Sequence, residues 1–270
     1  MCSLGLLTFV GLGLHDERGM SLRGLEELKK AEVVYAEFYT SPMPALSLGK
    51  LVALISKPVK ILSRVDIEER AEETILRSAQ TKRTALLVPG DPMVATTHID
   101  LMLRARKAGI ETSVVNGASI ISAISSVTGL QNYKFGRTVT IPILHEGSAA
   151  ESPYDYVKKN LSIGLHTLLL LEVGAESGRY VSVAEAFKQL LSVEARRKEN
   201  VVTQKTLAVG AARIGAEDMK VKAGRVKDLM ACDFGSPPHS IVIPSKLHFM
   251  EAEALQVLAE AERKVLEEHI

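Results

Sequence analysis

The chain has 270 residues, of which 46% are hydrophobic and 24% charged, a composition that excludes extensive disorder and leaves room for two ordinary domains. The formal net charge of +1 provides no overall field that would favour nucleic acid as a partner, and the two cysteines are too few for a disulfide framework or a structural zinc site. No apolar run approaches the ~20 residues that cross a bilayer, and the apolar segment 4–14 lacks the flanks of a signal peptide, so we expect a soluble, cytoplasmic protein without a membrane partner.

Short apolar runs alternate with amphipathic stretches over the first 120 residues or so. The runs predict strands at Leu4–Val10, Val33–Ala36, Val59–Leu62, Thr84–Val88 and Thr112–Val115. Helices are predicted between them, beginning near Ser21, Leu46, Asp66 and Thr96, with the one at Asp66 running to about Gln80. Another helix follows the last strand, with Ser119 or Ser122 near its cap. This alternation predicts an α/β domain with a mainly parallel sheet.

Glycines follow the first strand, in the sequence Gly11-Leu12-Gly13. The dinucleotide-binding fingerprint needs a third glycine where Asp16 stands, and a P-loop motif is absent from the sequence. What remains is a glycine corner, which either lets the backbone approach a ligand closely or forms a plain turn.

The stretch from Leu86 to His98 is the most informative part of the chain. A strand ends at Pro89-Gly90-Asp91-Pro92, and two threonines then open a helical pattern. Ligands of open α/β sheets bind at such a corner, beyond the carboxyl ends of the strands. Asp91 is therefore a candidate ligand acceptor, with the capping of its own turn as the alternative.

The second half of the chain predicts another α/β series, so we expect domains at residues 1–118 and 119–270. The polar loop Glu146–Pro153 is the best linker candidate. Strands are predicted at Thr167–Val173, Leu207–Ala212 and Ser240–Ile243, with a long final helix from Leu247 to about Glu268. Ser182 and Glu185 form a capping box for a further helix, and the Arg196-Arg197-Lys198 run is interpreted as a solvated helix end.

Five segments in this order resemble the diphthine synthases, a family of the tetrapyrrole methylase-like class of S-adenosylmethionine (SAM) methyltransferases. They are Val10–Arg18, Ala36–Ser41, Pro89–His98, Gly164–Glu172, and Arg225–Leu229 leading into Asp233–His239. The resemblance implies two α/β domains of the tetrapyrrole methylase type with the cofactor cleft between them. It also implies a homodimer and methylation of the 3-carboxy-3-aminopropyl-modified histidine of translation elongation factor 2, which gives diphthine and S-adenosylhomocysteine (SAH).

The resemblance places SAM against residues from both halves of the chain: Leu14, Asp91, Val94, Ser119, Ile120, Leu171, Ala212, Ile214 and His239. It leaves open whether Ala212 or Ile214 is the closer contact. Apolar walls with a few polar groups are what such a ligand needs, and the amides of a helix start at Ser119 suit its carboxylate. No residue is assigned as a base, and no metal is expected.

Several of these residues have plainer interpretations. Leu171 is typical of a strand in a core, Ser119 of a helix cap, and His239 of a structural histidine. Glu172 either neutralises a substrate cation or caps the sheet edge, and the plainer interpretation of His98 is a helix N-terminal residue with no further role. Two other functions also stay open, namely methylation of a tetrapyrrole and non-catalytic binding of SAM or of a translation factor.

Overall fold

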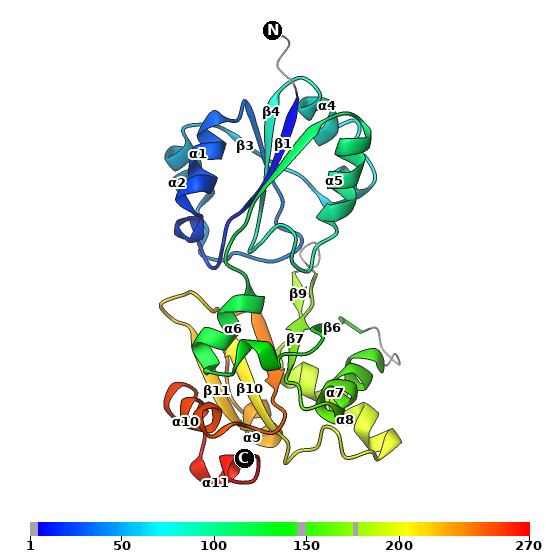
Figure 1. The fold of residues 1–270 in the computed structure, drawn as a ribbon, viewed down its shortest axis with the longest axis vertical. Helices are drawn as coiled ribbons and strands as arrows, with labels where there is room; N and C mark the ends of the chain where they lie inside the picture. Colours follow the sequence, from blue (N-terminus) through cyan, green and yellow to red (C-terminus); the bar gives the residue numbers. More distant parts are fainter. Residues whose placement is uncertain (1–4, 145–149, 175–177) are drawn as a thin grey trace. The chain divides into compact units, whose positions relative to one another are not determined.

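The computed structural model describes residues 5–144, 150–174 and 178–270, and the chain forms two compact units, residues 1–120 and 121–270 (Figure 1). The division falls at Ile120, close to the boundary expected after residue 118. It does not fall in the loop interpreted as a linker. Of that loop, residues 146–149 lie outside the described part of the chain, and Ser152 already begins helix α7 (Ser152–Ser162).

The N-terminal unit contains a five-stranded, wholly parallel sheet, so the predicted parallel α/β arrangement is confirmed. Its strand order is β3-β2-β4-β1-β5, with β1 (Leu6–Gly11), β2 (Val33–Ala36), β3 (Val59–Ile61), β4 (Arg83–Val88) and β5 (Glu111–Val115). Helices α1 (Leu22–Lys30) and α2 (Leu48–Ile55) lie on one side of the sheet, and α4 (Ile75–Ala79) and α5 (His98–Lys107) on the other (Figure 1).

Side chains of the central strand β4 alternate between the two sides of this sheet. Leu86 and Val88 pack in one buried cluster with residues of α4 and α5, while Ala85 and Leu87 pack in a second cluster with residues of α1 and α2. Because both faces are covered, the strand reads as a continuous apolar run, which is why the sequence identified it.

The C-terminal unit has a mixed five-stranded sheet in the order β11-β10-β12-β7-β6, in which only the β6–β7 pair is parallel. Its strands are β6 (Val139–Ile141), β7 (Thr167–Leu171), β10 (Leu207–Ala212), β11 (Lys220–Arg225) and β12 (His239–Ile243), and β8 (Val173–Gly174) pairs with β9 (Arg179–Tyr180). Its helices include α6 (Ile120–Thr128), α7, α8 (Val183–Arg197) and α9 (Val226–Met230). Within the described ranges, no helix is both long and apolar enough to span a membrane.

Two predicted helix starts are confirmed in detail. Ser21 caps α1 by accepting a hydrogen bond from the amide of Gly24, and Ser182 and Glu185 form the predicted capping box of α8. Both caps satisfy backbone donors that the first helical turn leaves without partners.

Two predicted helices are wrong in extent. The final helix is split into α10 (Phe249–Leu258) and α11 (Arg263–Leu266), because Glu260 adopts a left-handed φ of 53° and the Ala259 carbonyl accepts the amide of Ala223 in β11. The helix expected from Asp66 to Gln80 is also two pieces, α3 (Arg64–Glu68) and α4. Its cap is Ser63, and Asp66 completes that capping box from inside the helix.

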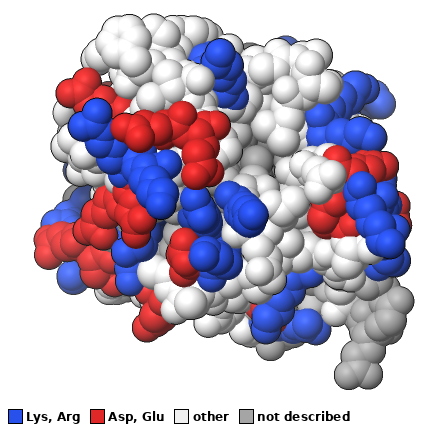
Figure 2. Space-filling view, turned by 90° about the horizontal axis from the view of Figure 1, so that it is seen from below, with Lys and Arg blue, Asp and Glu red and all other residues white. Residues whose placement is uncertain are grey.

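Acidic and basic side chains are interspersed on the face of the molecule shown in Figure 2, in keeping with the net charge of +1. Such a surface focuses no strong field of one sign, which agrees with the sequence-based interpretation of charge.

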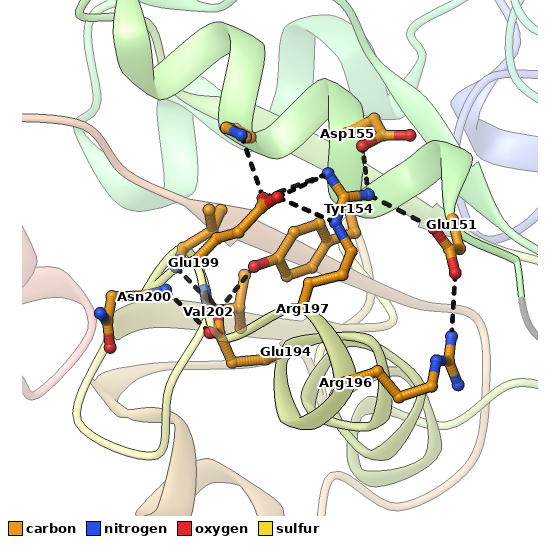
Figure 3. A network of polar contacts seen from close by, with 11 residues as sticks. Glu151, Tyr154, Asp155, Glu194, Arg196, Arg197, Glu199, Asn200 and Val202 are labelled. Carbon is orange, nitrogen blue, oxygen red and sulfur yellow. Dashed lines mark hydrogen bonds and ion pairs between the residues drawn. The ribbon is translucent and has the colours of Figure 1, made fainter.

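A polar network joins the start of α7 to the end of α8 (Figure 3). Arg197 pairs with Asp155 and Glu199, and its guanidinium lies 4.9 Å from the centroid of the buried Tyr154 ring. The Tyr154 hydroxyl donates to Glu194 at 2.7 Å. The interpretation of a solvated helix end is therefore wrong for Arg197, whose side chain is a structural link between two helices.

A second network is buried at the other end of the C-terminal unit, around the fully buried Glu251 of α10. The carboxylate accepts hydrogen bonds from the amides of Gln131 and His248, from His166 Nε2 and from the Lys134 ammonium. Burial alone would raise the pKa of Glu251, but these donors lower it to about 2. The network ties α10 to the loop that contains η2 (Asn132–Lys134) and to the residue before β7.

We predict that Glu251→Gln lowers the free energy of unfolding at pH 7 by about 2–4 kcal/mol, because the partly buried Lys134 ammonium loses its ionic partner and the buried network loses a charged acceptor. Urea unfolding measures this, with Glu253→Gln as the matched control, since Glu253 is exposed on the same helix and should change stability by less than about 0.5 kcal/mol.

The same pair of variants gives a pH dependence. A carboxylate with a lowered pKa stabilises the fold above its unfolded pKa of 4.5 and loses that contribution as the pH falls toward 2. The difference between the wild type and Glu251→Gln should therefore shrink below pH 4.5. A difference that stays constant down to pH 3 would contradict this assignment.

Candidate functional site

Three loops meet beyond the carboxyl ends of the neighbouring strands β4, β1 and β5. Gly13, after β1, and Gly90, after β4, exchange backbone hydrogen bonds in both directions, at 3.1 and 2.9 Å. This pairing extends the contact between the two strands into their loops, and it holds Leu14 beside the Asp91 turn.

The glycines of this corner are needed because the loops pack backbone against backbone. A Cβ on Gly117 would lie 2.2 Å from the Gly90 carbonyl oxygen, and a Cβ on Gly11 would lie 2.6 Å from the Gly117 nitrogen. Side chains at either position would force the loops apart. The close approach that the sequence suggested for a ligand at the Gly11–Gly13 corner is therefore used, at Gly11, by the protein's own loops.

Asp91 is buried and binds the loops together through its carboxylate. One oxygen accepts the amide of Met93 at 2.9 Å, and the other accepts Asn116 Nδ2 at 2.9 Å and the Gly117 amide at 3.2 Å. The first bond is the turn cap that the sequence offered as an alternative. The other two link the β4 loop to the β5 loop, a role that the sequence did not suggest.

The other candidate residues of the N-terminal unit lie in the loops that meet at this corner of the sheet. Leu14 follows the paired Gly13, and the Val94 amide donates to the Asp91 carbonyl at 3.3 Å. Ser119 is buried just before α6, which begins at Ile120. Leu14, Val94 and Ile120 remain partly exposed, so this loop cluster offers apolar side chains next to the amides of a helix start.

We predict that Asp91→Ala lowers the free energy of unfolding by about 2–4 kcal/mol, because it leaves three donors without their acceptor. Thermal and urea unfolding test this, with the exposed Asp100→Ala on α5 as the control. Unchanged stability in Asp91→Ala would show that the loops stay joined without the carboxylate.

The candidate residues of the C-terminal unit lie on three neighbouring strands. Ala212 at the end of β10 is opposite His239 at the start of β12, and Ser240 is opposite Leu170 of β7, so the antiparallel register brings His239 beside Leu171. Ile214 lies two residues after the end of β10 and is buried. The Leu171 side chain packs in the core of this unit, as the plainer interpretation expected.

His239 has one imidazole nitrogen in use and one without a partner. Nε2 lies 3.1 Å from the carbonyl oxygens of both Gly235 and Ser236, so it must carry the proton and donate. Nδ1 is buried and has no partner among the described residues. Burial lowers the pKa of His239, which keeps the ring neutral and leaves Nδ1 as an acceptor. A ligand that carries an N–H or O–H donor fits this orphaned acceptor.

Glu172 caps the edge of the sheet, since its carboxylate accepts the amide of Ile143 at 2.6 Å. This is the plainer of its two interpretations. Among the residues that the structure describes, no group of three His, Cys, Asp or Glu side chains is placed to hold a metal ion.

A buried pair near the Asp91 turn was missed by the sequence analysis. His98 Nδ1 donates to the Pro92 carbonyl at 3.1 Å, and Nε2 lies 3.8 Å from the carboxylate of Glu37. Both side chains are fully buried, and burial lowers the pKa of His98 and raises that of Glu37. Both residues belong to segments that carry the resemblance, which was the available signal, but no local pattern indicated that they meet.

One unit with a wholly parallel sheet and another with a mixed sheet, each accompanied by helices, define a two-unit α/β protein. Comparison with known families narrows this class. Residues 6–230 match the model of the Tetrapyrrole (Corrin/Porphyrin) Methylases.

Individual proteins of similar sequence and structure narrow the class further. The diphthine synthase of Methanocella arvoryzae is 49% identical over 94% of this chain and 98% of its own, and that of Methanocaldococcus jannaschii is 44% identical over 94% and 99%. A crystal structure of a diphthine synthase superposes with a TM-score of 0.88 at 38% identity, covering 98% of this chain and all of the other. The chain belongs to the tetrapyrrole methylase family and, within it, to the diphthine synthases.

Proposed function

We propose that this chain is a methyltransferase of diphthamide biosynthesis that uses SAM to methylate the amino group of the 3-carboxy-3-aminopropyl-modified histidine of elongation factor 2, giving diphthine. The observation that carries the proposal is the similarity to diphthine synthases, at 44–49% identity over nearly the full length of both chains. The enzyme acts in the cytoplasm on a protein substrate, without nucleic acid or membrane.

SAM supplies the methyl group on a sulfonium, which is already a good leaving group. In the N-terminal unit, Leu14, Val94 and Ile120 offer it apolar contacts, and the start of α6 at Ser119 suits its carboxylate. In the C-terminal unit, Ala212, Ile214 and Leu171 offer apolar surroundings and His239 offers an acceptor. The hydrogen bonds of the Asp91 carboxylate hold the β4 and β5 loops, which carry Val94 and Ser119, in place.

The residues of the chain have two tasks in this reaction. They hold the acceptor amine in line with the methyl carbon, and they exclude water from the reacting groups. The amine must attack in its unprotonated form. The proposal assigns no side chain as its base.

We propose in addition that the protein is a homodimer. Helix α10 leaves apolar side chains exposed at Phe249, Met250 and Val257, and Tyr133 of η2 is also exposed. A chain of 29.3 kDa should therefore sediment at about twice that mass at micromolar concentration. Val257→Lys should shift the equilibrium toward the monomer, while Asp100→Lys, at an exposed position of α5, should not. A stable wild-type monomer would contradict the proposal.

The function is tested by offering three acceptors to the purified protein with SAM and a metal chelator. They are elongation factor 2 carrying the aminocarboxypropyl group, the factor with unmodified histidine, and a free porphyrinoid. Mass spectrometry should show mass gained in methyl steps by the first acceptor only, with SAH released.

Each other outcome points to a different function. Methylation of the unmodified factor would make the imidazole the nucleophile, and methylation of the porphyrinoid would indicate a tetrapyrrole methylase. SAM binding without SAH release on any acceptor would indicate a binding module. Loss of activity with the chelator would show that a metal takes part.

A further inference from the structure

Arg213 follows β10 and directs its side chain at the loop that precedes His239. Its guanidinium is largely buried, and Nη1 donates to the carbonyls of Phe234 at 2.7 Å and Ser236 at 2.6 Å. The other nitrogens donate to the carboxylate of Asp218 at 2.7 Å and to its carbonyl at 2.9 Å. The side chain therefore joins two loops on either side of the candidate residues of this unit.

The backbone of Arg213 holds the same segment from its other end. Its amide donates to the Pro238 carbonyl at 2.9 Å, and Arg213 adopts a left-handed φ of 50°. A non-glycine residue in that region is uncommon, and it persists where surrounding contacts fix it. The stretch from Phe234 to Pro238 is thus held at three carbonyls by one residue.

The carbonyls of this stretch also determine the proton position on His239. The Ser236 carbonyl accepts both from Arg213 Nη1 and from His239 Nε2, and a carbonyl oxygen has two lone pairs for this purpose. Because Nε2 carries the only proton of a neutral ring, Nδ1 stays bare. The guanidinium, by holding the Ser236 carbonyl that is one of the two acceptors of Nε2, helps to fix which nitrogen is offered to a ligand.

The surroundings of the ring indicate which part of a ligand meets Nδ1. The rings of Tyr180 and Phe234 lie edge-on to the imidazole, with centroids 6.0 and 6.2 Å away, and Ala212 and Leu171 are its strand neighbours. Flat, apolar surroundings suit a nucleobase better than a ribose diol or a charged amino acid end.

We propose that Arg213 is a positioning residue that holds His239 with its proton on Nε2, so that Nδ1 accepts a hydrogen bond from the exocyclic amine of adenine in SAM and SAH. The inference rests on the proposed use of SAM. It adds how the adenine is recognised and which residue prepares that recognition.

Calorimetry with two nucleosides tests the acceptor. SAH carries the adenine amine, whereas S-inosylhomocysteine has a carbonyl oxygen in its place and would set an acceptor against Nδ1. The wild type should bind SAH about 10-fold more tightly or better. In Arg213→Met, SAH affinity should fall by about 3- to 10-fold and the preference between the two nucleosides should be largely lost.

Arg197→Met is the matched control, because it removes another multiply bonded arginine of the same unit that shares no hydrogen bond with His239. It should keep the wild-type preference. Arg213→Lys, which retains the charge on a single donating nitrogen, should recover part of it.

The tautomer is measured directly by ¹⁵N NMR of the ligand-free protein, in which protonated and bare imidazole nitrogens give well-separated signals. His239 should show a protonated Nε2 and a bare Nδ1 in the wild type, and a mixture of tautomers in Arg213→Met. The wild-type arms of both measurements stand even if Arg213→Met fails to fold.

The possible failures are distinguishable. If neither nucleoside binds, the proposed use of SAM is wrong. If SAH binds but is not preferred, or if Arg213→Met keeps both the preference and the tautomer, the function stands and this inference is overturned.

Discussion

The N-terminal unit depends on one buried carboxylate. Parallel strands leave their loops side by side at one edge of a sheet, but nothing in the sheet itself joins those loops. Asp91 joins them here, because its two oxygens accept donors from its own turn and from the β5 loop. The glycines at positions 11 and 117 allow the close approach that makes these bonds short enough. The positions of Val94 and Ser119 follow from this junction, and that of Leu14 follows from the backbone pairing of Gly13 with Gly90.

In the C-terminal unit, the loops are joined by a positively charged side chain. Its loops present carbonyl oxygens, and the guanidinium of Arg213 holds them with donors whose planar geometry suits several acceptors at once. In both units, a charged side chain hydrogen-bonds to backbone groups of the loops and joins them. The groups that remain available to a ligand are therefore uncharged, namely partly exposed apolar side chains and an unprotonated imidazole nitrogen.

Patterns among neighbouring residues predicted the helices and strands that such patterns alone can specify. Strand β4 is covered on both faces and reads as an apolar run, and Ser182 with Glu185 is a cap three residues apart. Strand β11 was missed because its lysines interrupt any apolar run, as is common at a sheet edge. The final helix was drawn too long because neither Gly nor Pro marks Glu260, whose backbone turns to fit a contact from β11. Contacts distant in the sequence were beyond such patterns, including the bond from Asn116 to Asp91 and the meeting of Glu37 with His98.

The fold alone does not select the acceptor of the methyl group, because one fold supports many substrates and the site decides among them. The resemblance selected it because part of that resemblance resides in loop segments such as Ala36–Ser41 and Pro89–His98. The structure gives a physical reason for that. His98 reaches from the second of these segments toward Glu37 in the first, and it holds the Pro92 carbonyl next to Asp91. Residues that look independent in the sequence thus support a single loop arrangement, and a change in any one of them would disturb the others. Such mutual dependence explains why these segments, each modest alone, identify the family together.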